Sequence, residues 1–224
     1  MPTALIAGAS RGIGLEFARQ YAEGGWRVIG TCRDAAGESR LRTAGADAHR
    51  LDVSDAGQIS ALAASLAGTS IDVFVHNAGI YGTDASGIRA PDEAAFEEVM
   101  RVNVLAAMRT LAAIGPLVAR ASGRMAYITS SMGSIGQMSG TYGWLYRVSK
   151  AALNAAIKSA SAELGAKGVT CVVLHPGWVR TDMGGPGAPL DVATSVSGMR
   201  RVISRLQKAD NGRFLDHNGA GIPW

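Results

Sequence analysis

A tyrosine and a lysine four residues apart, Tyr146 and Lys150, have a spacing that indicates proton-transfer chemistry. Residues at i and i+4 share one face of a helix. A tyrosine with its ordinary pKa of about 10 is a weak base at neutral pH, but a nearby ammonium group favours the phenolate and lowers that pKa. Tyr146 could then give a proton to an alkoxide or take one from an alcohol. The same spacing occurs by chance on many helices, so this interpretation depends on partners elsewhere in the chain.

Polar residues at three other positions could meet this pair. Ser130 and Ser131 follow an expected strand, where a hydroxyl would point into the ligand crevice of an open sheet. Asn77 follows the expected strand before it, in Asn77-Ala78-Gly79. Asn103 lies inside an expected helix, and a polar amide there indicates a bond to another buried group or a cap.

A glycine-rich turn, Ala7-Gly8-Ala9-Ser10-Arg11-Gly12-Ile13-Gly14, follows the first expected strand and opens the first helix. Gly8 would allow a tight turn, Gly12 would let the backbone approach a pyrophosphate, and Gly14 would let the helix pack close to the sheet. The free N–H groups and the dipole of the helix N-terminus favour phosphate. A glycine triplet alone also fits a structural turn without a ligand, but its place between a strand and a helix favours a dinucleotide site.

The end of the second expected strand indicates which dinucleotide is bound. NAD sites usually carry an acid there, whereas NADP sites use a basic residue that pairs with the 2′-phosphate. Cys32 stands where the acid is expected, Arg33 follows it, and Arg11 lies in the glycine-rich turn. Two arginines can bind one phosphate through charge-assisted hydrogen bonds, which predicts NADP(H). NAD(H) is the alternative, because Asp34 could bond a ribose hydroxyl.

Short apolar runs alternate with longer helical periods along the chain. This alternation predicts an α/β fold with a doubly wound parallel sheet, the Rossmann fold. The runs, typical of buried parallel strands, are Ala4–Ala7, Arg27–Thr31, Val73–His76, Met125–Thr129 and Val169–Leu174, with a last short strand at Arg213–Asp216. The expected helices are Gly14–Glu23, Ala56–Leu66, Glu93–Val118 and Leu145–Leu164, and the irregular segments are Ile80–Pro91 and Gly184–Pro189.

Composition limits the class of protein. The 224 residues fit one domain, 1–224, and a hydrophobic fraction of 47% argues against disorder. The net charge of +4 is scattered, which argues against a nucleic-acid surface. We find no signal peptide and no stretch of ~20 apolar residues, so we expect no membrane span and a cytoplasmic protein. We expect the two cysteines, Cys32 and Cys171, to be buried apolar side chains. We expect no metal site, because no carboxylate or cysteine cluster accompanies the histidines His49, His76, His175 and His217.

Taken together, these motifs resemble the short-chain dehydrogenase/reductase family along nearly the whole chain. The pieces that carry the resemblance are Gly8/Gly12/Gly14, Leu51-Asp52-Val53, Asn77-Ala78-Gly79, Asn103, Ser130-Ser131, Tyr146-x-x-x-Lys150 and Pro176-Gly177. The chain most resembles the C-factor-like and sniffer-like reductases of that family, through Met132-Gly133-Ser134-Ile135, the segment from Tyr146 to Asn154, and Thr181-Asp182-Met183-Gly184-Gly185.

The resemblance implies a role for each matching residue. Ser131 would bond the substrate oxygen, Tyr146 would be the acid/base, Lys150 would bond the nicotinamide ribose and tune Tyr146, and Asn103 would hold a water of a proton relay. Asp52 and Val53 would lie by the adenine, Asn77 near the ribose, and the segment from Pro176 to Thr181 over the nicotinamide. The expected cofactor-binding residues are Gly8, Ser10, Arg11, Gly12, Ile13, Gly14, Arg33, Asp52, Val53, Asn77, Ala78, Gly79, Tyr146, Lys150, Pro176, Gly177, Val179 and Thr181.

The chain departs from the family pattern at two places. The gap between Ser131 and Tyr146 is two residues longer than in most of the family, so Ser130 and Ser134 stay open as the substrate serine. The segment from Met183 to Val192 is short and rich in glycine, which predicts an open substrate mouth with modest specificity. The apolar walls of this mouth would be formed by Trp144, Trp178, Tyr81, Met138 and Met183. The alternative is that some of these side chains only pack against the rest of the protein.

The function that these residues predict is reduction of an aldehyde or ketone, or the reverse oxidation of an alcohol, with NADP(H). The alternative is a cofactor-binding signalling or regulatory protein that needs no turnover, because a fold does not fix a function. The resemblance also implies a homodimer or homotetramer paired through the two long helices, Glu93–Val118 and Leu145–Leu164.

Overall fold

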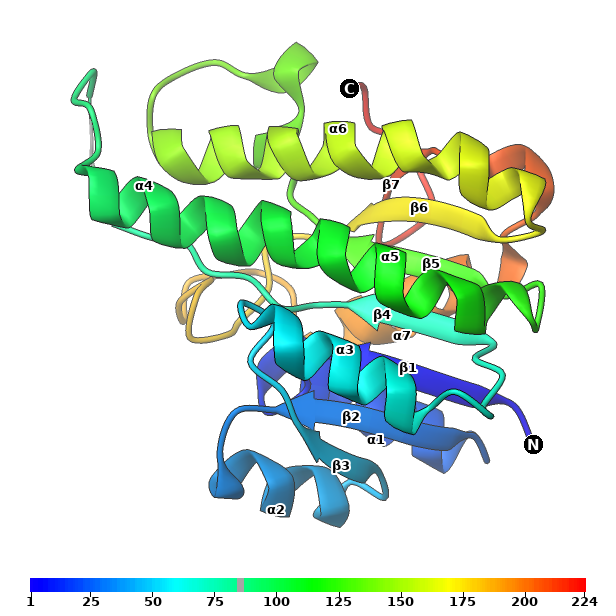
Figure 1. Cartoon of the computed structure of the whole chain (residues 1–224). Helices are drawn as coiled ribbons and strands as arrows, with labels where there is room; N and C mark the ends of the chain where they lie inside the picture. Colours follow the sequence, from blue (N-terminus) through cyan, green and yellow to red (C-terminus); the bar gives the residue numbers. More distant parts are fainter. Residues whose placement is uncertain (84–86) are drawn as a thin grey trace.

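Seven parallel strands form one sheet in the order β3-β2-β1-β4-β5-β6-β7 (Figure 1). The structure is a computed structural model that describes residues 1–83 and 87–224. The chain runs outward from β1 to β3 and then returns to pair β4 with the other side of β1. The strands are β1 (Thr3–Ala7), β2 (Arg27–Cys32), β3 (Asp47–Arg50), β4 (Val73–His76), β5 (Arg124–Ile128), β6 (Thr170–His175) and β7 (Phe214–Asp216).

Helices cover both faces of this sheet, as Figure 1 shows. On one face, Phe17, Leu41 and Val196 belong to one buried cluster, so α1, α2 and α7 form one layer. On the other face, α3, α5 and α6 share a second cluster. The helices are α1 (Gly12–Glu23), α2 (Ala35–Thr43), α3 (Ala56–Ser65), α4 (Glu93–Met100), the π-helix η1 (Arg101–Leu105), α5 (Ala106–Ala119), α6 (Trp144–Ala166) and α7 (Val192–Arg205), with short 3-10 turns η2 (Ser131–Gly133), η3 (Ile135–Gln137) and η4 (Lys208–Asp210).

The doubly wound parallel sheet predicted from the sequence is confirmed. β1 lies between β2 and β4, so the strand order reverses there, and the crevice beyond the carboxyl ends of these strands is where ligands bind in such sheets. Cys32 and Cys171 are buried and free, as expected. Of the irregular segment Ile80–Pro91, residues 84–86 lie outside the described residues.

One strand and two α-helices were not predicted, nor were the short 3-10 turns. The edge strand β3 has the polar sequence Asp-Ala-His-Arg, so it lacks an apolar run. The short helix α2 buries only Gly37 and Leu41. Helix α7 carried a usable signal, because Asp191 caps it and its buried residues include Val196, Met199 and Ile203 at helical spacing.

The predicted long helix Glu93–Val118 is one continuous helical run that changes its winding in the middle. Helix α4 ends at Met100, the π-helix η1 follows, and α5 begins at Ala106. A π turn inserts one extra residue per turn, and such turns often occur at functional sites. Asn103 is buried within η1.

This same run corrects the expectation that no stretch is long and apolar enough for a membrane span. Within the described residues, the run Glu93–Ala119 passes that test by length and composition, with a mean hydropathy of 1.6 over an 18-residue window. Its buried residues, such as Ala107 and Ile114, pack against the sheet. A core helix of this kind meets the same criterion without crossing a membrane.

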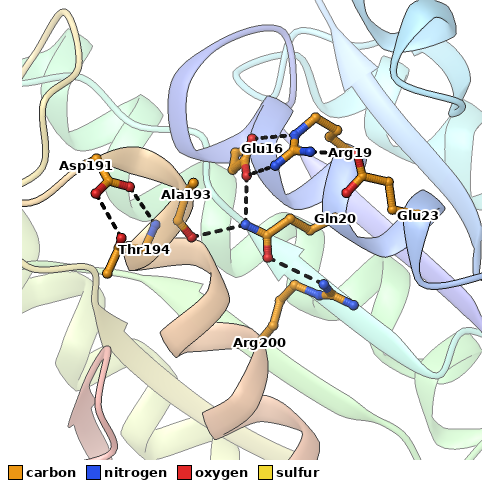
Figure 2. A network of polar contacts seen from close by, with 8 residues as sticks. All are labelled: Glu16, Arg19, Gln20, Glu23, Asp191, Ala193, Thr194 and Arg200. Atoms are coloured by element: carbon orange, nitrogen blue, oxygen red, sulfur yellow. Dashed lines mark hydrogen bonds and ion pairs between the residues drawn. The ribbon is translucent and has the colours of Figure 1, made fainter.

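A polar network joins α1 to the start of α7 (Figure 2). The Gln20 amide donates to the carboxylate of Glu16 at 2.7 Å and to the carbonyl of Ala193 at 3.0 Å, and it accepts from Arg200 at 3.4 Å. The Asp191 carboxylate caps the first turn of α7. These contacts fix α7 beside α1. Helix α7 follows directly on the loop after β6, which forms one side of the candidate active site.

Candidate active site

Two positions of the glycine-rich turn, Gly8 and Gly14, leave no room for a side chain. A Cβ on Gly14 would lie 2.1 Å from the carbonyl oxygen of Gly8, so helix α1 can pack here only with glycine. Gly8 has φ of +78°, and its Cβ would lie 2.8 Å from the backbone of Ala78. The turn after β1 therefore packs directly on the turn after β4.

Polar contacts hold this turn in shape. The Asn77 amide donates to the Gly8 carbonyl at 2.8 Å, and the Gly8 N–H donates to the Thr31 hydroxyl at 3.1 Å. The guanidinium of Arg40 on α2 donates to the carbonyl of Ser10 at 2.7 Å, a contact that the sequence did not suggest. Asn77 thus stabilises the turn, and its expected place near the ribose stays a prediction.

Helix α1 begins at Gly12 with no side-chain cap, so its first N–H groups, from Gly12 to Gly14, remain available to a ligand. Such a helix end binds phosphate through its N–H groups and its dipole. The uncapped helix end and the closely packed glycines of the turn fit the pyrophosphate of a dinucleotide.

The surroundings of Asp34 and Arg33 at the end of β2 favour NADP(H) over NAD(H). The Asp34 carboxylate caps α2 by accepting the Gly37 N–H at 2.6 Å, so it is engaged in the fold. Arg33 is exposed and takes part in none of the ion pairs of the described residues. Arg11, in the glycine-rich turn, forms an exposed ion pair at 3.1 Å with Asp182, which lies in the loop after β6. Arg33 and Arg11 thus lie at positions suited to a phosphate. Arg33 forms no ion pair among the described residues, and Arg11 could exchange its ion pair with Asp182 for a phosphate.

The adenine side of the expected site is ordered by backbone contacts. Asp52 accepts the N–H and the hydroxyl of Ser54 at 2.8 and 2.7 Å, and these bonds lower the pKa of the Asp52 carboxyl. Val53 is buried. Both residues follow β3, which pairs with β2 and so brings them beside Arg33.

Tyr146 and Lys150 lie buried together in the first turns of α6. The Lys150 ammonium donates to the carbonyl of Ile128 at 3.0 Å and lies 5.6 Å from the centre of the Tyr146 ring. Burial lowers the pKa of Lys150 to about 8. Burial raises the pKa of Tyr146 to about 12, and a hydrogen bond with Ser130 opposes this rise. The pKa of Tyr146 therefore shifts upward, opposite to the direction that the sequence predicted from the nearby ammonium group.

The serine beside Tyr146 is Ser130. Ser130 has extended backbone angles after β5 and its side chain bonds to Tyr146, whereas Ser131 begins the 3-10 turn η2. Because the turn begins at Ser131, the serine whose side chain reaches Tyr146 is Ser130, one residue earlier than expected. Ser134 is completely buried and donates to the carbonyl of Pro223 at 2.5 Å, so its hydroxyl is engaged elsewhere.

Asn103 connects the segment after β4 to α6. Its amide oxygen accepts the Ile80 N–H at 2.8 Å, and its amide nitrogen donates to the Ile80 carbonyl at 2.8 Å and to the Ser149 hydroxyl at 2.9 Å. The Ser149 hydroxyl in turn donates to the Tyr146 carbonyl at 2.8 Å. A Cβ on Gly79 would lie 3.3 Å from both Asn103 and Lys150, so the chain passes closely between them.

The loop after β6 forms the other side of the site. The Pro176 carbonyl accepts the Ser195 hydroxyl at 2.6 Å, and Gly177 has φ of +86°. Val179 is buried and pairs with Leu190 in a parallel bridge, so the two ends of the loop from Val179 to Leu190 are held together. The open substrate mouth expected at the short segment from Met183 to Val192 stays a prediction. The Thr181 methyl lies 3.5 Å from the position of a Cβ on Gly12, so this loop faces the glycine-rich turn.

The side chains expected at the substrate mouth differ in their surroundings. Tyr81 stacks on Tyr146, with ring centres 4.8 Å apart. The indole of Trp178 is 60% exposed and donates to the carbonyl of Gly184 at 2.8 Å. Exposed apolar side chains are also present at the remaining expected positions, Met138, Trp144 and Met183. Within the described residues, no group of three or more metal-ligating side chains occurs.

The carboxyl edge of the sheet thus carries a phenolic hydroxyl, a serine hydroxyl and an ammonium group together with the glycine-rich turn. Residues 2–188 match the model of the short chain dehydrogenase family. The chain belongs to this family. This match agrees with the resemblance inferred from the sequence.

Relatives and solved structures support this membership. The chain is 42% identical to C-signal of Myxococcus xanthus over 155 residues, which cover 69% of this chain and 93% of that protein. It is similar to the carbonyl reductase Sniffer of D. melanogaster, with a TM-score of 0.93, 31% identity and full coverage of both chains. A short-chain dehydrogenase/reductase from Burkholderia multivorans with bound NADP has a TM-score of 0.91 and 35% identity, covering 100% of this chain and 99% of that one.

We predict that Asn103→Ala lowers the free energy of unfolding by about 1–3 kcal/mol, because it leaves the Ile80 N–H and carbonyl without their partners. Urea unfolding followed by circular dichroism measures this change. Asn218→Ala, on the exposed turn after β7, is the matched control. Equal stability losses in the two variants would contradict the structural role of Asn103.

Proposed function

We propose that this protein is an NADPH-dependent carbonyl reductase that transfers a hydride to an aldehyde or ketone. The observation that supports this most is the placement of Tyr146, which is buried beside Ser130 and Lys150. The same residues serve alcohol oxidation in the reverse direction, because a proton donor for one direction is the acceptor for the other.

Each residue of this group has a distinct task in the proposed reaction. The bound nicotinamide cofactor supplies the hydride. The Ser130 hydroxyl exchanges its bond with Tyr146 for a hydrogen bond donated to the substrate oxygen, while its own oxygen keeps accepting the Met132 N–H at 3.1 Å. The Tyr146 hydroxyl gives its proton to the forming alkoxide. The Lys150 ammonium stabilises the phenolate that remains.

Asn103 can serve a proton relay only through its remaining acceptors. Both hydrogens of its amide are engaged by Ile80 and Ser149. A relay water at this residue would therefore donate to the amide oxygen or to the main-chain carbonyl. The first task of the side chain, in this proposal, is to hold the segment after β4 in place.

NADP(H) is the cofactor that the site favours. Arg33 is free to pair with a 2′-phosphate, and Asp34, which could have bound a ribose hydroxyl, is engaged as a helix cap. The similar Burkholderia multivorans structure contains NADP. Arg11 would exchange its exposed ion pair with Asp182 for the phosphate.

We predict that the protein binds NADPH more tightly than NADH. The Arg33→Ala variant should weaken NADPH binding by about 10–100-fold through loss of a charge-assisted hydrogen bond, and should leave NADH binding nearly unchanged. Nicotinamide fluorescence titration measures both, and Arg205→Ala, far along α7, is the control. Tighter binding of NADH by the unmodified protein would show that the cofactor assignment is wrong.

The two neighbouring serines should differ in a panel of aldehydes and ketones reduced with NADPH. Tyr146→Phe should lower kcat by about 10²–10⁴-fold, because it removes the proton donor. Ser130→Ala should lower it by about 10²–10³-fold, because it removes a hydrogen bond to the developing charge. Ser131→Ala is the matched control and should keep most of the activity; the opposite order of the two serine variants would return the role to Ser131.

A regulatory function without turnover is the second candidate, and the 42% identity to C-signal supports considering it. The intact group of Ser130, Tyr146 and Lys150 favours the enzyme, because signalling alone does not require it. A Tyr146→Phe protein that kept full biological activity would favour the regulatory function.

We also propose that the protein forms a homodimer or homotetramer through the outer face of the α4–α5 run and α6. This face exposes Phe96, Leu105, Met108 and Val148 to 40–50%. Apolar side chains gathered in this way favour an interface. Light scattering coupled to size exclusion should show two or four chains for the unmodified protein and fewer for Met108→Glu. A monomeric unmodified protein would contradict the proposal.

A further inference from the structure

We propose that Tyr81 is a positioning residue for Tyr146, whose ring it covers on one face and holds against motion and water. This inference rests on the proposed function, because it concerns the proton donor of that reaction. The two rings stack with centres 4.8 Å apart and planes 30° apart. Stacked aromatic pairs contribute more than the area they bury.

The chain on either side of Tyr81 is fixed. Ile80 is held at both its N–H and its carbonyl by Asn103. Gly82, on the other side, has φ of +82°, and a Cβ there would lie 2.6 Å from the side chain of Val99. The backbone of Tyr81 therefore lies between two positions that the helical run of α4 and η1 holds in place.

The hydroxyl end of Tyr81 packs against the start of α6. Gly143 caps this helix with φ of +64°, and a Cβ there would lie 2.5 Å from the Tyr81 hydroxyl oxygen and 2.7 Å from the end of Met132. Tyr146 leaves α6 one turn later. Tyr81 thus contacts both the first turn of α6 and the ring that projects from it, so its position and that of Tyr146 are linked.

The other groups around Tyr146 come from known elements. Ser130 faces its hydroxyl from the end of β5, and Lys150 faces its ring from the next turn of α6. His76, at the end of β4, lies near Lys150; burial and then Lys150 lower its pKa to about 3, so it stays neutral. Tyr142 lies beyond Tyr81, with ring centres 6.5 Å apart. Tyr81 is therefore the aromatic ring that covers one face of the Tyr146 ring.

Loss of this ring should change how Tyr146 titrates. Burial is the main cause that raises the pKa of Tyr146 to about 12. A Tyr81→Leu variant admits water to the ring, so the pKa of Tyr146 should fall toward its ordinary value of about 10. A Tyr81→Phe variant keeps the ring and should leave the titration unchanged.

The test uses tyrosine labelled with ¹³C at the ζ carbon, in the protein without cofactor or substrate. Spectra of each variant are compared with those of its Tyr146→Phe counterpart, which assigns the Tyr146 signal. We expect an earlier titration of this signal in Tyr81→Leu and in a second ring-less variant, Tyr81→Met, than in Tyr81→Phe and the unmodified protein. Tyr142→Leu, which removes the neighbouring exposed ring, is the control and should shift the signal less.

Kinetics give a second readout. Tyr81→Leu should lower kcat by about 10–100-fold through loss of alignment, with little change in KM for NADPH, and Tyr81→Phe should restore the rate. An unchanged Tyr146 titration in both ring-less variants, or equal kinetic losses in Tyr81→Leu and Tyr81→Phe, would overturn the proposal. If no carbonyl is reduced at all, the proposed function fails, while the titration still decides the role of Tyr81.

Discussion

The buried amide of Asn103 joins three parts of the chain that must lie together for the site to exist. Through Ile80 it fixes the segment after β4, and through Ser149 it reaches the first turns of α6. An amide in the middle of a helix is costly to bury without partners. Asn103 lies in the π turn η1, at a position where its amide reaches these hydrogen-bond partners. The glycine-rich turn depends on the same region, because Gly8 packs on Ala78, just before the clamped segment.

The chemistry of the site follows from burial. Tyr146 and Lys150 are both nearly inaccessible, and burial disfavours the charged form of each, which raises the pKa of one and lowers the pKa of the other. The tyrosine is thereby kept protonated, which suits a proton donor in carbonyl reduction. The lysine retains a partner in the carbonyl of Ile128, so its amino group stays fixed in either protonation state.

Sequence reasoning reached the parts of the site that depend on local spacing. The triplet Gly8, Gly12 and Gly14 and the pair Tyr146 and Lys150 each lie within one turn or helix, so their geometry can be predicted from the order of residues. The choice between Ser130 and Ser131 could not be predicted, because it depends on where the 3-10 turn η2 begins. The clamp on Ile80 could not be predicted either, because it is made with main-chain atoms 23 residues away.

Transfer of deuterium from NADPH labelled at the nicotinamide C4 tests the central claim most directly. The labelled cofactor is incubated with a panel of aldehydes and ketones, and the products are analysed by mass spectrometry. The account predicts alcohols that carry deuterium on the former carbonyl carbon with the unmodified protein, and a large loss of this product with Tyr146→Phe. Absence of labelled alcohol from every substrate, with NADPH bound, would contradict the account and favour a regulatory protein that binds the cofactor without turnover.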